Sequence, residues 1–187
     1  MRFGVLLQLF HTMGKRDLKK YLTGLDKAQL EAQFIDLYDK FPEVKTYYDF
    51  VFNPREEKLV REAKAKISNE YFPVKTKRAK LRRSTAQKFI KHFLVLGVDP
   101  FAVADVMLHA IEVAQKYTAK REVRYNSFYK SMYNSFAQAA DYIIGHGLAH
   151  EFEPRLLALF QEAQRQKWPN IWDFDRVMAR FNNGNSC

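Results

Sequence analysis

The sequence has one cysteine among its 187 residues, and that cysteine, Cys187, is the last residue. An intramolecular disulfide is therefore excluded, and so is a structural zinc site built from several thiolates. Glycine and proline are also scarce, with seven and six residues. A fold rich in loops or strands needs turn residues about every ten positions, so this composition argues against an all-β protein.

Long apolar runs are missing as well. No segment approaches the roughly eighteen consecutive apolar residues that a membrane-spanning helix needs, so we expect no membrane-embedded segment. The N-terminal MRFGVLLQLF has a short apolar run behind one arginine, but no small-residue cleavage site follows it. We therefore expect a cytoplasmic protein that starts naturally at Met13, with residues 1–12 as an upstream extension.

Helical periodicity dominates what remains. Hydrophobic residues make up 47% of the chain, and from Lys15 to Phe181 they recur at helical spacing without any strand-like alternation. Tight turns between predicted helices indicate antiparallel helical pairs, and the absence of a fixed repeat period argues against a regular solenoid. The sequence therefore predicts an all-α protein, an irregular bundle of about eight or nine helices, with residues 13–187 as a single helical domain.

Local signals place some of these helices. The predicted helix 100–118 is apolar on nearly every side, so we expect it at the centre of the bundle. Ser84 and Gln87 form a capping-box pattern that predicts a helix over about 85–96. Pro154 is predicted to start a later helix, because proline suits the first helical position.

Acidic residues are absent from one whole stretch. Between Tyr71 and Val98 there is no Asp or Glu, whereas eight Lys and Arg residues fall there, against 23 basic and 21 acidic residues in the rest of the chain. We predict a basic linker at about 74–83 that leads into a helix whose N-terminal amides, capped by Ser84, favour a phosphate. The predicted anion- or nucleic-acid-binding residues are Lys75, Lys77, Arg78, Lys80, Arg82, Arg83, Ser84, Lys88 and Lys91.

A second, weaker basic zone is interleaved with tyrosines. Tyr125, Tyr129 and Tyr133 recur at i, i+4 and i+8, a spacing that could form a ledge on which unpaired bases stack. Tyrosines at this spacing are more often half-buried packing residues with an exposed hydroxyl. The basic residues of this zone are Lys116, Lys120, Arg121, Arg124 and Lys130.

One polar stripe interrupts the apolar helix 100–118. Asp105, His109, Glu112 and Lys116 lie on one face, and a histidine between two carboxylates suits a general base or a metal site. A line of ion pairs along that face explains the same pattern, and no second helix carries a matching ligand motif. Phosphate loops and nucleophile motifs are absent too. We therefore expect no catalytic residue, no metal, no cofactor and no enzymatic activity.

Four strings in the first half of the chain resemble the signature stretches of a known family. The family is an uncharacterised bacterial group of small helical proteins, described only as a domain of unknown function. The resemblance covers roughly Met13 to Phe181 and supports the start at Met13, but it implies no activity, cofactor or site residue. The strings are KRDLKKYL (15–22), VKTYYDFVFNP (44–54), AKISNEYFP (65–73) and KLRRSTAQKFIKHF (80–93).

The functional hypothesis therefore depends on charge. The first hypothesis is a non-enzymatic helical module that contacts the phosphates of RNA or of single-stranded nucleic acid. The alternative is a protein-interaction or scaffolding module whose basic segment docks on an acidic partner protein. The sequence leaves the choice between them open, together with any sequence preference and the oligomeric state.

Overall fold

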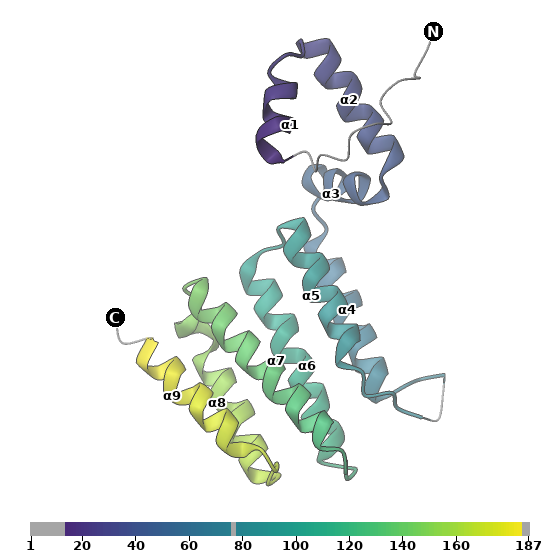
Figure 1. Ribbon diagram of the computed structural model, residues 1–187. Helices are drawn as coiled ribbons and strands as arrows, with labels where there is room; N and C mark the ends of the chain where they lie inside the picture. The colour runs from purple at the N-terminus through teal and green to yellow at the C-terminus, as the bar shows by residue number, and fades with distance from the viewer. Residues whose placement is uncertain (1–13, 76–77, 185–187) are drawn as a thin grey trace. The chain divides into compact units, whose positions relative to one another are not determined.

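The computed structural model describes residues 14–75 and 78–184, which form nine helices and no strand (Figure 1). The predicted all-α fold is thereby confirmed. Residues 1–12, Lys77 and Cys187 lie outside the described residues. The helices are α1 (Lys15–Leu22), α2 (Lys27–Lys40), α3 (Pro42–Phe52), α4 (Glu56–Tyr71), α5 (Arg83–Leu96), α6 (Pro100–Thr118), α7 (Asn126–Gly145), α8 (Ala149–Arg165) and α9 (Ile171–Gly184).

The chain divides between Phe52 and Asn53 into two compact units. We call helices α1–α3 the N-terminal unit and helices α4–α9 the C-terminal unit. The sequence shows no linker at this point, and it predicts one domain over residues 13–187. The contacts between helices instead separate two units.

The N-terminal unit is held together by a few contacts. The ring of Phe34 on α2 meets the ring of Tyr48 on α3 edge to face, with centroids 5.1 Å apart. The hydroxyl of Tyr38 donates a hydrogen bond to Asp49 at 2.7 Å. No described side chain of α1, α2 or α3 is buried. The described part of this unit therefore lacks a hydrophobic core.

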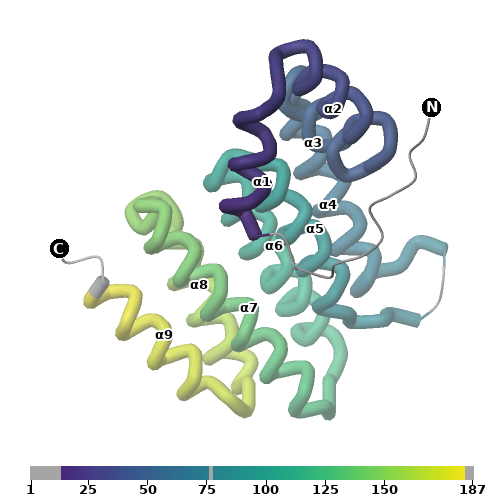
Figure 2. Tube along the Cα trace, turned by 45° about the horizontal axis from the view of Figure 1, so that its top comes forward, coloured from purple at the N-terminus to yellow at the C-terminus, as the bar shows by residue number. Residues whose placement is uncertain are grey.

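The C-terminal unit is built around α6. Its six helices run alternately up and down (Figures 1 and 2), and α6 packs on α4, α5, α7 and α8. Val106, Leu108 and Ile111 on α6 have no exposed surface, which confirms the predicted central position. Asp99 caps this helix, because its carboxylate accepts hydrogen bonds from the amides of Phe101 and Ala102. None of the described helices, α6 included, combines the length and the hydropathy that crossing a membrane requires.

Two helices begin earlier than the sequence predicts. Helix α5 starts at Arg83 with Arg82 as the N-cap residue, so Ser84 is the second residue of the helix and the predicted Ser84 cap is wrong. Helix α8 starts at Ala149, and Pro154 lies inside it. A proline in a helix removes one backbone hydrogen bond, which the packing of α8 against α6 and α9 outweighs.

The assigned core can be tested at two neighbouring positions on α5. Phe93 is fully buried, whereas Leu94 is 49% exposed. We expect Phe93→Ala to lower the free energy of unfolding by about 3–5 kcal/mol, because it removes a buried ring and leaves a cavity. Leu94→Ala is the matched control and should cost no more than about 1 kcal/mol. Urea denaturation followed by circular dichroism measures both, and equal losses would contradict the assignment of the buried face.

Candidate functional site

The buried residue Glu70 anchors the basic segment to the end of α4. Its carboxylate accepts two hydrogen bonds from the guanidinium of Arg82, each 2.9 Å long. Its backbone carbonyl accepts hydrogen bonds from the amides of Lys80 and Leu81, at 2.8 and 3.2 Å. Leu81 adopts a positive φ of 54° within this connection. Residues 80–82 are therefore tied to α4 and do not form a free linker.

The carboxylate of Glu70 also lies at the first turn of α5. The hydrogen bond from Arg82 is the main cause that lowers the pKa of Glu70. The hydroxyl of Thr85 and the nearby charge of Lys80 lower this pKa further, whereas burial raises it. Glu70 is therefore ionised at neutral pH. The amides at a helix N-terminus favour an anion, and at α5 the carboxylate of Glu70 lies beside the side chains of Arg82 and Thr85, close to the position where we predicted a phosphate.

Arg83 points into the C-terminal unit. Its Nε donates a hydrogen bond to the hydroxyl of Ser135 at 2.8 Å, and its Nη2 donates one to the side chain of Gln138 at 3.1 Å. Burial lowers the pKa of this arginine. Since Ser135 and Gln138 lie on α7, Arg83 joins α5 to α7. Two of the predicted phosphate-binding residues, Arg82 and Arg83, thus bind groups of the protein itself.

The predicted lysines remain at the surface. Lys75, Lys80, Lys88 and Lys91 are exposed, and none of them forms an ion pair with another described residue. Arg78, Arg82 and Ser84 are exposed as well, although Arg82 pairs with Glu70, and Lys77 lies outside the described residues. The exposed part of the predicted site therefore consists mainly of lysines.

Packing brings the start of the basic segment to the end of α6. The rings of Tyr71 and Phe72, at the end of α4, lie 6.0 and 5.9 Å from the ring of Tyr117 on α6. The two basic zones of the sequence therefore lie at the same end of the C-terminal unit, where the chain leaves α4 and α6 (Figure 1).

The cations at the end of α6 and just after it also include both partnered and exposed residues. Arg124 pairs with Glu122 at 3.0 Å, and the guanidinium of Arg121 lies over the ring of Tyr117 at 5.6 Å. Lys116 and Lys120 are exposed and form no ion pair within the described residues. We define the basic end as the four exposed lysines that lie where the chain leaves α4 and α6, Lys75, Lys80, Lys116 and Lys120; Lys130 is also exposed but lies on α7.

A groove opens between α6 and α8 beside Lys116 and Lys120. Its volume is about 620 Å³. The buried side chain of Gln115 donates a hydrogen bond to the carbonyl of Leu159 at 2.6 Å and so links the two helices. The groove combines an apolar wall with the two lysines and with two carboxylates, Glu112 and Glu162, which pair with Arg155 and Arg165. Its apolar lining comes from Phe72, Ala119, Ala158 and Leu159.

The tyrosine row does not form a stacking ledge. The hydroxyl of Tyr129 donates a hydrogen bond to the carbonyl of Val123 at 2.9 Å, and its ring packs against that of Trp168. The ring of Tyr133 packs against Phe174, and only the remaining tyrosine of the row, Tyr125, is well exposed. The interpretation as packing residues holds for Tyr129 and Tyr133.

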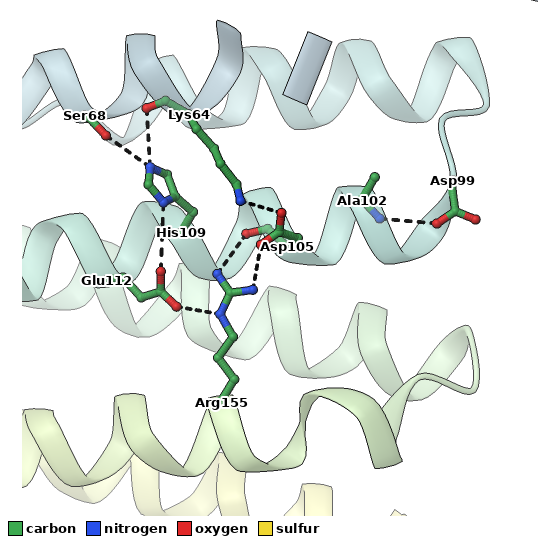
Figure 3. A network of polar contacts seen from close by, with 8 residues as sticks. All are labelled: Lys64, Ser68, Asp99, Ala102, Asp105, His109, Glu112 and Arg155. Atoms are coloured by element: carbon green, nitrogen blue, oxygen red, sulfur yellow. Dashed lines mark hydrogen bonds and ion pairs between the residues drawn. The ribbon is translucent and has the colours of Figure 1, made fainter. Parts of the chain in front are cut away.

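The polar stripe of α6 forms an ion-pair network with two neighbouring helices (Figure 3). Arg155, which comes from α8, binds the carboxylate of Asp105 at 2.7 Å and that of Glu112 at 2.5 Å. Lys64, which comes from α4, binds the other oxygen of Asp105 at 2.5 Å. Neither partner could be found from the periodicity of α6, because each lies on a helix distant in sequence.

His109 completes this network. Its Nε2 lies 3.1 Å from the hydroxyl of Ser68 and 3.3 Å from the carbonyl of Lys64, and its Nδ1 lies 3.9 Å from Glu112. Burial lowers the pKa of His109 below its usual range, so the ring is neutral at pH 7. No group of candidate metal ligands occurs within the described residues. The geometry shows ion pairs for Asp105 and Glu112, whereas His109 is neutral and Lys116 forms no ion pair within the described residues.

Residues 13–182 match the model of a family of unknown function, DUF6155. The chain belongs to this family. The DUF6155 match spans both units and includes all four lysines of the basic end. No curated protein and no solved structure matches the chain. The description of DUF6155 names no activity, so the function has to be argued from the geometry above.

Removal of Arg155 tests the network. We expect Arg155→Met to lower the free energy of unfolding by about 2 kcal/mol, because the partly buried carboxylates of Asp105 and Glu112 lose their shared partner. Arg165→Met is the matched control, since Arg165 is exposed and pairs with Glu162 on its own helix; it should cost less than about 1 kcal/mol. Urea denaturation compares the two, and a smaller loss for Arg155→Met would contradict the role of the network.

The neutral state of His109 predicts a pH dependence of stability. Its pKa is lowered in the folded protein, so below about pH 6.5 the unfolded chain binds more protons than the folded one. The free energy of unfolding should therefore fall as the pH is lowered from about 7 to about 5. His109→Gln should reduce this slope, whereas His150→Gln, at an exposed position, should leave it unchanged. An identical slope in both variants would contradict the prediction.

Proposed function

We propose that the protein is a non-enzymatic module that contacts the phosphates of RNA or of single-stranded DNA through its basic end. The observation that carries this proposal is the convergence of two lysine pairs, Lys75 with Lys80 and Lys116 with Lys120, at one end of the C-terminal unit. All four are exposed and form no ion pair within the described residues. Exposed lysines of this kind bind phosphate by releasing its counterions.

The distribution of net charge along the chain supports the binding of a polyanion at the basic end. Residues 53–187 contain 23 basic and 14 acidic residues, so they hold nearly all of the net charge of +10. A field of this sign attracts polyanions and accelerates their encounter with the protein. Lys88 and Lys91 lie further along α5 and extend the exposed cationic surface from the connection that precedes this helix.

The groove between α6 and α8 favours unpaired strands over a duplex. Its lining is largely apolar, and Lys116 and Lys120 contribute to it. In single-stranded nucleic acid the bases can turn away from the backbone and enter such a groove while lysines hold the neighbouring phosphates. Lysines act as point charges and read no base edges. We therefore infer binding with little sequence preference.

Salt dependence of binding tests the proposal. Each phosphate contact on a single strand contributes about −0.7 to the slope of log affinity against log salt concentration. A variant in which the four lysines of the basic end are replaced by Gln should therefore have a slope that is shallower by about 3. The four changes are Lys75→Gln, Lys80→Gln, Lys116→Gln and Lys120→Gln. Fluorescence anisotropy with a labelled oligouridine measures this slope. The matched control replaces four other exposed lysines by Gln and removes the same charge: Lys27, Lys40, Lys58 and Lys66.

The control should have the same slope of log affinity against log salt concentration as the unmodified protein.

Arg82→Gln and Arg83→Gln should also keep this slope, but they should lower the free energy of unfolding, because both arginines bind protein groups. Salt-independent or undetectable binding by the unmodified protein would overturn the proposal, and so would an equal change of slope in the control. Purified protein that is free of nucleic acid but captures an acidic polypeptide would favour the scaffolding alternative.

A further inference from the structure

One aromatic ring lines the groove between α6 and α8 together with its lysines. Phe72 is 41% exposed, and Lys116 and Lys120 line the same groove. The ring of Tyr117 meets that of Phe72 edge to face, with centroids 5.9 Å apart, so part of the Phe72 ring stays uncovered. A partly exposed ring beside cations is typical of a surface on which nucleobases stack.

The backbone of Phe72 is held in place before any ligand binds. Its amide donates a hydrogen bond to the carbonyl of Ser68 at 2.8 Å, at the point where α4 ends. The next residue is Pro73, and a proline restricts the backbone of the residue before it. The ring packs on Tyr117, which belongs to α6. A residue fixed in this way loses little conformational freedom on binding, which favours affinity.

The unpaired charges of the groove are positive. Each of its two carboxylates pairs with an arginine, Glu112 with Arg155 and Glu162 with Arg165. The two lysines of the groove form no ion pair within the described residues. In a single strand each internal base is joined to a phosphate on either side, so a ring with two unpaired cations complements a base and its phosphates. An acidic side chain offers a charge for a lysine but no aromatic face for the ring.

We propose that the ring of Phe72 stacks against one unpaired base of a bound strand while Lys116 and Lys120 contact the phosphates beside that base. The inference rests on the proposed function and names the residue that gives the groove its preference for single strands. In a duplex the faces of a base are covered by its neighbours, so Phe72 stacks only on a base that has left the helix. The lysines set the salt dependence of binding, whereas stacking adds affinity without releasing counterions.

An abasic strand separates stacking from phosphate contact, because it keeps the phosphates and lacks the bases. Fluorescence anisotropy compares labelled oligouridine with an abasic strand of the same length. Phe72→Leu should weaken the binding of oligouridine at least about fivefold, the lower end of what one stacked base contributes, and leave the binding of the abasic strand unchanged. The slope of log affinity against log salt concentration should stay the same. Phe72→Trp, which keeps an aromatic face, should retain the affinity for oligouridine.

The matched control is Phe101→Leu. Phe101 is 50% exposed and packs against the ring of Phe152 at 4.7 Å, but it lies at the start of α6, whereas the groove lies at the end of this helix. The change removes the same ring and should leave both affinities unchanged. Circular dichroism checks that each variant keeps its helices.

Tryptophan fluorescence reports the stacking directly. Of the two native tryptophans, Trp168 is buried and Trp172 is 78% exposed. In the double variant Phe72→Trp with Trp172→Phe, the introduced tryptophan is therefore the more exposed of the two. Oligouridine should quench its fluorescence, because a base stacks on its ring, and the abasic strand should not.

The outcomes distinguish this inference from the proposed function. Undetectable binding of both strands by the unmodified protein would overturn the proposed function and the inference with it. Salt-dependent binding of oligouridine that Phe72→Leu leaves unchanged, or a loss that is equal for the abasic strand or for Phe101→Leu, would overturn the stacking alone. The absence of quenching by oligouridine would also overturn it, and so would polyglutamate that binds as tightly as oligouridine, because this acidic polypeptide offers no base.

Discussion

The burial of α6 is the constraint on which the C-terminal unit depends. A helix that is apolar on nearly every side has to be covered, and α4, α5, α7 and α8 cover it. Its one polar stripe can lie between helices only because Lys64 from α4 and Arg155 from α8 supply charges for Asp105 and Glu112. Unpaired, these carboxylates would make burial of that face costly. The polar network therefore determines which helices flank the stripe, and the apolar surface determines that they pack at all.

Internal hydrogen bonds give two arginines of the basic segment partners within the protein. Arg82 binds Glu70 with both arms of its guanidinium, and Arg83 binds Ser135 and a neighbouring amide on α7. A planar guanidinium suits such fixed, partly buried contacts, whereas the ammonium of lysine stays strongly hydrated. Arg82 and Arg83 consequently hold helices together, although the side chain of Arg82 is still 53% exposed, while the four described lysines of the segment are exposed and form no ion pair within the described residues. A surface of lysines suits contact with phosphates that does not depend on sequence.

The fold could be predicted where its cause is local in sequence. Periodicity predicted the helices and the central place of α6, because both follow from the spacing of apolar residues. The start of α5 could not be predicted, since the carboxylate of Glu70 reaches it from another helix, whereas a capping-box pattern spans only Ser84 to Gln87. The meeting of the two basic zones depends on the contact of Phe72 with Tyr117. Periodicity also marks an apolar face without showing whether anything covers it, which is why the exposed faces of α1–α3 could not be foreseen.

The net charge of the chain lies almost wholly in the C-terminal unit. Residues 14–52 contain as many acidic as basic residues, whereas residues 53–187 contain nine more basic than acidic residues. The long-range attraction for a polyanion therefore comes from the unit that carries the basic end. Salt screens this attraction and also weakens each phosphate contact of a lysine, so both contributions to binding decrease together as the salt concentration rises.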